Sequence, residues 1–309
     1  MGEGRGVGPL ATTAETADAA RAAPAGRRLP LVWLGVAPFF LWASAFLLLP
    51  GGALLVGAFR TQEGGFTTAF VSNLLEGQYR DAYVTSIKIS VLTAVLGGLI
   101  GLFMAYAALS QGAPRWIRPA LTTFSGVAAN FGGVPLAFAF ISTIGTVGLA
   151  TRALDGLGID LYGRGFTLFG FWGLVVTYLY FQIPLMILVI APAIEGLKAE
   201  WREAASNLGA TATQYWRHVG IPILMPSILG AMLLLFGGSF AAYATAFALT
   251  SGHVALTPLQ IGELLSGNVF TDPHQAYALA VGMIVVIAVV MTLYFLLERR
   301  ASRWRRTAR

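Results

Sequence analysis

Long apolar runs dominate the chain and separate shorter polar segments. A helix needs about 20 mostly apolar residues to cross the hydrocarbon core of a bilayer. Six runs reach this length: 31–59, 82–109, 119–149, 168–193, 223–250 and 275–297. The pattern therefore predicts an all-α, polytopic membrane protein with six transmembrane helices. Pro38 and Pro50 predict bends in the first of them.

The polar ends of the chain lie outside these runs. Residues 1–30 are rich in Ala, Gly, Thr and Arg without apolar periodicity, which predicts a disordered cytoplasmic tail. The small residues at 43–45 look like a signal-peptide cleavage site, but the run continues uncharged to Arg60 and is too long for a signal peptide. We therefore expect the tail, one six-helix membrane domain over 31–297, and a basic cytoplasmic tail over 298–309.

The distribution of charge predicts how the chain is oriented. Charged residues make up 11% of the sequence, against about 25% in soluble domains. The net charge is +6, and the basic residues flank the apolar runs. Fifteen of the 20 Lys and Arg residues fall on one side of a six-span arrangement; the four on the other side are Arg60, Arg80, Arg152 and Arg164. Because cytoplasmic loops carry the excess of Lys and Arg, both termini are predicted to be cytoplasmic, in a multi-pass protein of the cell membrane.

Several kinds of chemistry are excluded by the sequence. A chain without Cys has no thiol catalysis, Cys-ligated zinc or iron–sulfur cluster. No G-x-x-x-x-G-K-[S/T] phosphate loop occurs. Every Asp, Glu and His falls in a tail or a loop, so Ser239 has no embedded base to activate it. We therefore predict no catalytic residue, no metal site and no cofactor bound by this chain, which is not an enzyme.

Lys88 is the one ionisable residue placed within an apolar run. It is either a counter-charge for a substrate or a side chain that snorkels to the interface. Ion-coupled secondary transporters usually carry carboxylates or His residues inside their spans. Their absence here argues against that class.

The loop 194–222, between the fourth and fifth runs, carries the most informative pattern. Good helix formers and an apolar stripe predict an amphipathic helix in its first half. The stripe consists of Leu197, Trp201, Ala204, Ala205 and Leu208. Gly209 is a candidate C-cap, because glycine adopts positive φ without steric cost.

A second short helix is predicted in the other half of the loop. Thr211 or Thr213 can cap its N-terminus, and Tyr215 and Trp216 give it an apolar face. Pro222 is expected to close it before the fifth run. The pattern thus predicts a helix–turn–helix hairpin with exposed aromatic side chains at the cytoplasmic surface. An amphipathic hairpin resting on lipid headgroups would show the same pattern.

The spacing within this loop resembles the EAA loop of binding-protein-dependent ABC importer permeases. Their pattern is Glu-Ala-Ala, three residues, Gly, nine residues, Ile, one residue, Leu-Pro; this sequence has Val for Ile and Ile for Leu. The matching positions are Glu203, Ala204, Ala205, Gly209, Val219, Ile221 and Pro222. The resemblance covers residues 82–297 and implies the type I importer permease (MetI-like) architecture.

The resemblance also implies a function and a set of partners. Two permease subunits, identical or different, would form the translocation pathway, and an extracytoplasmic solute-binding protein would deliver the solute. Each EAA loop would dock as a coupling helix on an ABC ATPase dimer at the cytoplasmic face, and the ATPase would use ATP and Mg. Glu203 would pair with a basic ATPase residue, and Ala204 and Ala205 would allow close docking. The surroundings implied are the lipid bilayer, with no nucleic acid.

Polar and helix-breaking residues in the third, fourth and fifth runs predict a translocation path. The element Gly132-Gly133-x-Pro135 breaks a membrane helix, and its freed backbone groups must be satisfied by protein or water. Tyr180 and Gln182 would line the path or bond between helices. The candidate path residues are Asn130, Gly132, Gly133, Tyr180, Gln182 and Tyr243.

The nature of the solute is suggested only by resemblance and by charge. These segments are similar to the permeases grouped with spermidine/putrescine importers, which implies a small solute such as a polyamine, with ferric iron, thiamine or aminoalkylphosphonate as alternatives. The loops predicted to lie outside carry more acidic than basic residues, seven against four. The acidic residues are Glu63, Glu76, Asp81, Asp155, Asp160, Glu263 and Asp272. This balance favours a cationic solute or a surface that docks the binding protein. A stand-alone secondary transporter is the rival from another class; it would need embedded charge and would not need the EAA loop.

Overall fold

The computed structural model describes residues 29–61, 63–109, 114, 116–163, 165–266 and 273–307. Within these ranges the chain is almost entirely helical and forms no strand, although an isolated antiparallel bridge joins Arg60 and Phe66. The chain divides into two units, 1–53 and 54–309, which we describe one after the other. Residues 1–28 of the predicted tail and Asp272 lie outside the described residues.

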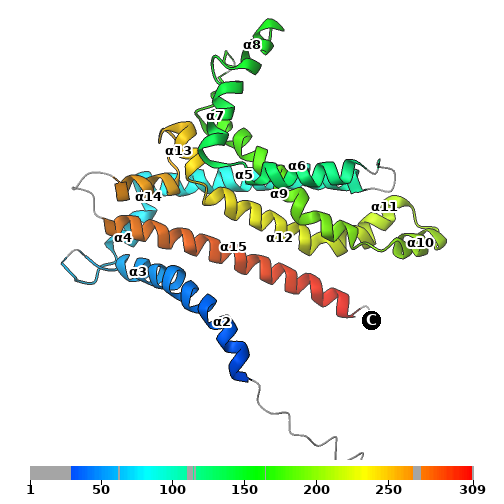
Figure 1. Cartoon of the computed structure of the whole chain (residues 1–309), viewed down its shortest axis with the longest axis horizontal. Helices are drawn as coiled ribbons and strands as arrows, with labels where there is room; N and C mark the ends of the chain where they lie inside the picture. Colours follow the sequence, from blue (N-terminus) through cyan, green and yellow to red (C-terminus); the bar gives the residue numbers. More distant parts are fainter. Residues whose placement is uncertain are drawn as a thin grey trace, which may run out of the picture. The chain divides into compact units, whose positions relative to one another are not determined.

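Helices of very different lengths follow one another along the chain (Figure 1). In chain order they are α2 (Leu29–Ala43), the π-helix η1 (Ser44–Leu48), α3 (Leu49–Gly57), α4 (Ala69–Ser72), the 3₁₀-helix η2 (Asn73–Leu75), α5 (Gly77–Leu109), α6 (Ile117–Asn130), α7 (Gly133–Ile144), α8 (Leu149–Gly156), α9 (Phe171–Glu195), α10 (Ala199–Asn207), α11 (Ala212–Tyr215), the π-helix η3 (Trp216–Gly220), α12 (Ile221–Phe240), α13 (Ala244–Thr250), α14 (Thr257–Ser266) and α15 (Pro273–Thr307). The backbone of residues 298–307, in the predicted C-terminal tail, is thus part of α15.

The first unit contains α2, η1 and the start of α3. Pro50 has no N–H to give to the carbonyl of Phe46, and the π-helical turn η1 lies at this point. In contrast, α2 continues through Pro38 without a break. The most apolar 18-residue window of this span buries none of its residues within the chain.

The prediction of six membrane-crossing helices is confirmed. Within the described residues, six stretches are long and apolar enough to cross a membrane: 35–57, 77–109, 133–156, 171–195, 212–240 and 273–296. The all-α, polytopic fold class is therefore correct. The predicted boundaries agree within a few residues for the first, second, fourth and sixth helices.

The third predicted run, 119–149, is not one helix. α6 ends at Asn130, and α7 begins at Gly133 and points away from the direction of α6 (Figure 1). Pro135 lies in the first turn of α7, where its missing N–H costs no helical hydrogen bond. The stretch long enough to cross is 133–156, made of α7 and α8. The break predicted from Gly132 to Pro135 is therefore present, and the error lay in counting α6 as part of the same span.

The fifth predicted run, 223–250, is also wrong in its limits. α12 ends at Phe240, and residues 241–243 separate it from the short helix α13. The crossing stretch starts earlier, at Ala212, and includes α11 and η3. Apolarity alone could not mark this boundary, because residues 241–250 are as apolar as the end of α12.

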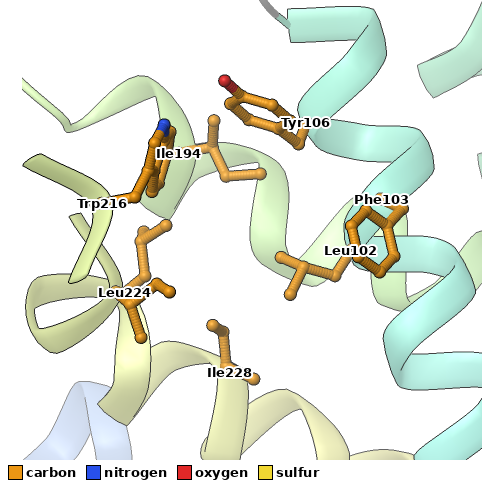
Figure 2. A pocket seen from close by; sticks show the side chains of 8 residues that line it. Leu102, Phe103, Tyr106, Ile194, Trp216, Leu224 and Ile228 are labelled. Atoms are coloured by element: carbon orange, nitrogen blue, oxygen red, sulfur yellow. The ribbon is translucent and has the colours of Figure 1, made fainter. Parts of the chain in front are cut away.

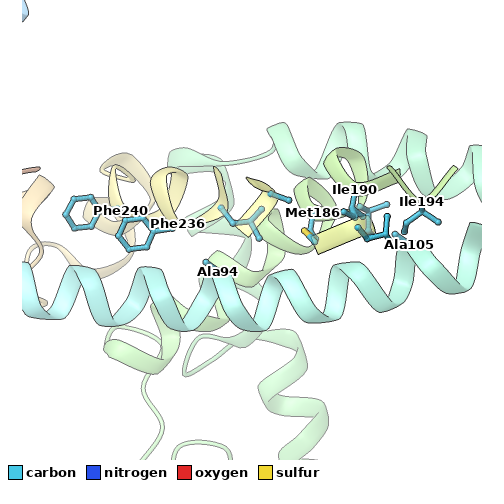
Figure 3. Packing of buried hydrophobic residues seen from close by; sticks show 11 residues of the cluster. Ala94, Ala105, Met186, Ile190, Ile194, Phe236 and Phe240 are labelled. Atoms are coloured by element: carbon cyan, nitrogen blue, oxygen red, sulfur yellow. The ribbon is translucent and has the colours of Figure 1, made fainter. Parts of the chain in front are cut away.

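In the second unit, α5 packs along α9 and α12 to form the core. Figure 3 shows the buried side chains of this cluster following α5, from Phe236 and Phe240 of α12 at one end to Ile190 and Ile194 of α9 at the other. Glycines of α5 allow the close approach. A methyl group at Gly101 would lie 2.6 Å from Met186 Cβ, so the two helix backbones nearly touch there.

The two ends of the core carry different elements (Figure 1). At one end lie α10 and α11. There the start of α6 is joined to the end of α9 by an ion pair between Arg118 Nη2 and Glu195 Oε1, which are 2.5 Å apart. At the opposite end lie α13 and α14, where the N–H of Thr257 donates to Ser86 Oγ of α5 at 2.9 Å. The two candidate functional regions are therefore the end of the core with α10 and α11 and the end with α13 and α14.

Candidate coupling hairpin and translocation path

The first half of the hairpin is a short helix with a tightly defined end. Gly209 follows α10 with φ of +77°, the conformation predicted for it. The N–H of Gly209 donates to Ser206 O and the N–H of Ala210 donates to Ala205 O, both at 2.9 Å. These are the two hydrogen bonds of a Schellman motif, which fixes the direction of the chain after the helix.

The second half begins with a capping box. Thr211 Oγ1 accepts from the N–H of Gln214 at 3.3 Å, and the N–H of Thr211 donates to Gln214 Oε1 at 2.7 Å. Of the two candidate caps, the structure uses Thr211, and Thr213 lies inside α11. A helix end with both bonds is well defined.

Pro222 does not close the second helix, contrary to the prediction. α11 continues through the π-helical turn η3 into α12, so the hairpin is joined to a membrane helix without a loop. Pro222 lacks the N–H that would bond His218 O, and the irregular turn precedes it directly. Movement of the hairpin would therefore act directly on α12.

The aromatic side chains of the second half are not exposed, which corrects a second expectation. Tyr215 is buried, and the half-buried Trp216 ring meets Tyr106 of α5 edge-on with centroids 5.0 Å apart. Figure 2 shows Trp216 and Leu224 facing Leu102, Phe103 and Tyr106 across an apolar pocket of about 300 Å³. These rings anchor η3 to α5.

The helix α10, in contrast, is not covered by the rest of the chain. None of its residues is buried. Trp201 is 37% exposed and Leu208, which follows α10, is 87% exposed. The EAA-like residues lie as follows: Glu203, Ala204, Gly209, Ile221 and Pro222 are exposed, and Ala205 and Val219 are half-buried. The hairpin thus has one anchored half and one half that is largely exposed: Trp201, Ala204 and Leu208 of its apolar stripe are exposed, whereas Leu197 packs against the core.

At the other end of the core, two interrupted helices meet. Gly133, with φ of +72°, donates its N–H to Thr245 Oγ1 of α13 at 2.8 Å. The hydroxyl of Tyr178 donates to Ala242 O, in the break between α12 and α13, at 3.3 Å. Broken helices in membranes occur where protein or a water-filled cavity satisfies the backbone. The junction of the α6–α7 and α12–α13 breaks is therefore the candidate path.

Besides Gly133, three predicted path residues on the side of α6, α7 and α9 lie around this junction. Asn130 is exposed at the end of α6, and its amide group donates to Gly126 O within the same helix at 2.8 Å. Gly132 is half-buried between α6 and α7. The Tyr180 ring of α9 packs edge-on against Phe131 and Phe140. The structure therefore brings Tyr180 close to the break, although in an aromatic cluster.

Gln182 packs against another helix, and Tyr243 belongs to the break between α12 and α13. Gln182 is completely buried between α9 and α5, and its Nε2 donates to Thr93 Oγ1 at 2.8 Å. Of the two roles considered for Gln182, lining the path or bonding between helices, the structure shows the second. Tyr243 is 40% exposed and stacks on Phe247.

Thr245 and Tyr178 hold the junction together and were missed by the sequence analysis. Each supplies a hydroxyl to a backbone group more than 60 residues away. No periodicity or spacing connects such positions. No local signal marked either residue, because the break between α12 and α13 was not predicted.

Lys88 is exposed on the surface of α5. Because α5 begins at Gly77, Lys88 lies about 16 Å from the start of the helix at 1.5 Å per residue. Helical side chains lean toward the N-terminus, so its ammonium group can extend toward the nearer membrane surface. This geometry suits snorkelling.

Comparisons with known proteins show the family of this chain. Residues 97–303 match the family model described as "Binding-protein-dependent transport system inner membrane component". Members of this family are multi-pass permeases of ABC importers. The chain belongs to that family, whose members are permease subunits and not enzymes themselves.

Individual relatives match most of the chain at low identity. The "Spermidine/putrescine transport system permease protein PotB" of Haemophilus influenzae is 25% identical over 87% of this chain and 94% of that protein. The "Trehalose transport system permease protein SugB" of Mycobacterium tuberculosis is 26% identical over 72% of this chain and 73% of that protein. A chain from the crystal structure of a bacterial ABC transporter for the acidic polysaccharide alginate has the same fold, with a TM-score of 0.69 and 17% identity over 87% of this chain and 95% of that chain.

Proposed function

We propose that this chain forms half of the translocation pathway of an ATP-driven, binding-protein-dependent importer of a small solute. In this proposal the hairpin around α10 is the contact with the ATPase, and the junction of broken helices at the other end of the core is part of the path. Family membership supports the first statement. The observation that carries the assignment of the hairpin is the uncovered face of α10.

A coupling element needs a free surface, a defined shape and a rigid connection to the pore. α10 supplies the free surface with Glu203 and the small side chain of Ala204. The Schellman motif and the capping box define the shape. The continuous helix from α11 to α12 supplies the connection. An amphipathic hairpin on lipid would need only the apolar stripe.

The proposal includes four kinds of partner. An ABC ATPase dimer, with its ATP and Mg, would bind the hairpin, and a second permease subunit, identical or different, would complete the path. An extracytoplasmic solute-binding protein would dock at the opposite end, and lipid would surround the exposed apolar surfaces. Both termini would be cytoplasmic in the cell membrane. Within the described residues, no group of three or more His, Asp or Glu side chains could hold a metal ion.

A polyamine such as spermidine or putrescine is our first proposal for the solute. The relative named for spermidine/putrescine supports it. Relatives of similar identity are named for trehalose, thiamine and sulfate. The identity of the solute must therefore be argued from the side chains of this chain. Thiamine, ferric iron and aminoalkylphosphonate are the alternatives.

Reconstitution tests the energy source. We expect the purified chain alone in proteoliposomes to hydrolyse no ATP and to show no uptake driven by a proton gradient, because it has no phosphate loop and no embedded proton relay. Adding its ATPase, second permease and binding protein should give ATP-dependent uptake. Gradient-driven uptake by the single chain would instead show a secondary transporter.

Reporter fusions test the orientation. We expect fusions after Arg115 and Arg217 to report the cytoplasm and fusions after Arg164 to report the outside, because the basic residues are concentrated on the predicted cytoplasmic side. The structural positions of Arg115 and Arg164 lie outside the described residues. An external position for Arg217 would contradict the coupling proposal, since an ATPase could not reach the hairpin.

A further inference from the structure

A polar pocket lies between α13 and α14, at the opposite end of the core from the hairpin. Its volume is about 320 Å³, within the range of small-molecule sites. The described residues that line it are Tyr243, Phe247, Ser251, Gly252, Leu259, Gln260, Glu263 and Ser266. From the sequence, Glu263 is only part of an acidic balance and Tyr243 only a path candidate.

Two helix faces form this pocket because the chain reverses between them. Tyr243, Phe247 and Ser251 follow one another at intervals of four residues, which places them on one face of α13. Ser251 and Gly252, with φ of +49° and +84°, turn the chain back. The facing side of α14 then presents Gln260 and Glu263, which are three residues apart.

The chemistry of the lining is that of a site for an organic cation. The Tyr243 and Phe247 rings stack with centroids 5.5 Å apart and an angle of 12° between their planes. Aromatic faces attract ammonium groups within about 6 Å of the ring centroid. Glu263 supplies a carboxylate that forms no ion pair within the described part of the chain, and none of the described lining residues is basic.

The position of the Tyr243 ring is fixed by close packing. A methyl group at Gly262 of α14 would lie 2.5 Å from Tyr243 Cε2, so this ring rests directly on the α14 backbone. Tyr243 also directly precedes α13, whose Thr245 bonds to the α6–α7 break. The pocket is therefore built from the same segment as the candidate path.

We propose that this pocket receives the ammonium group of a cationic solute on its way into the path. This inference depends on the proposed importer function and narrows its solute to organic amines. Glu263 would neutralise the charge, and the two rings would cover the apolar part next to it. An anion would be repelled by Glu263.

The test measures binding of putrescine to the assembled permease–ATPase complex in nanodiscs of neutral phosphatidylcholine, without the binding protein. Equilibrium dialysis with labelled putrescine should show saturable binding that unlabelled tetramethylammonium displaces and that sulfate and trehalose do not. Glu263→Gln and Tyr243→Leu should each weaken binding about two- to fivefold, the scale of a cation–π contact or charge pair at an exposed site. Glu76→Gln, which changes an exposed carboxylate elsewhere, should bind like the unmodified chain.

Three results would overturn the assignment. The first is the absence of saturable putrescine binding, and the second is displacement by trehalose or sulfate. The third is binding that is unchanged in Glu263→Gln; if that variant instead loses docking of the binding protein, the pocket holds a side chain of that protein. ATPase co-purification in the same preparation separates the two proposals, since its loss would contradict the importer function whatever the pocket binds.

Discussion

Glu203→Lys in α10 should stop uptake while leaving the protein in the membrane at normal abundance. Glu203 is exposed and makes no ion pair within the described part of the chain, so its replacement removes no contact that holds the fold. In the proposed complex it faces a basic residue of the ATPase. A buried interfacial charge pair that loses one partner costs about 2–5 kcal/mol, and a Lys would add repulsion.

Co-purification of the ATPase and its stimulation by loaded binding protein measure this effect. Both should be lost in Glu203→Lys and partly restored by an acidic substitution at the facing position of the ATPase. Glu76→Lys, an exposed carboxylate at a helix end outside the hairpin, is the matched control and should couple normally. Normal coupling in Glu203→Lys would mean that the hairpin rests on lipid, where an added Lys is favourable.

Gly209 provides a second variant in the same element with a different physical cause. Gly209→Val places a β-branched side chain at φ of +77°, at a cost of about 1–3 kcal/mol. The turn would change direction and α10 would be misplaced, so a compensating charge on the ATPase should not rescue it. Gly209→Asn should retain much of the coupling, because Asn tolerates positive φ.

The sequence was most informative where local rules decide the structure. The stop at Gly209 and the cap at Thr211 follow from backbone conformation and hydrogen bonds within a few residues. The number of membrane helices follows from apolar length. These features need no knowledge of the rest of the chain.

Features that depend on contacts between distant residues could not be predicted. Trp216 appeared exposed in a helical pattern, but its ring packs on Tyr106 of α5. Gln182 suggested a polar path, but its amide bonds to Thr93 between two helices. The end of α12 at Phe240 also depends on the neighbouring helix, since Tyr178 of α9 bonds to the break. The pocket at Glu263 forms because the chain turns at Ser251, and a positive φ at a serine is not predictable from residue type.

The second large effect is expected at Gly101, where α5 and α9 approach closely. A methyl group there would lie 2.6 Å from Met186 Cβ and 2.8 Å from Ile183 O. The second of these is a backbone atom, so the clash cannot be relieved by turning a side chain. Gly101→Ala should therefore force the helices apart and destabilise the protein by about 1–3 kcal/mol, the usual cost of overpacking.

Gly126→Ala is the matched control for this prediction. Gly126 lies inside α6, and a methyl group there would have nothing within 4 Å. Both substitutions gain the same helix propensity, about 1 kcal/mol, so the difference between them isolates the packing cost. Gly98→Ala should fall between the two, because its methyl group would meet only the flexible Met232 side chain, at 3.0 Å. Thermal unfolding in detergent should rank the melting temperatures as Gly126→Ala, then Gly98→Ala, then Gly101→Ala. A Gly101→Ala variant as stable as Gly126→Ala would contradict the close contact of α5 with α9, on which the position of the whole core depends.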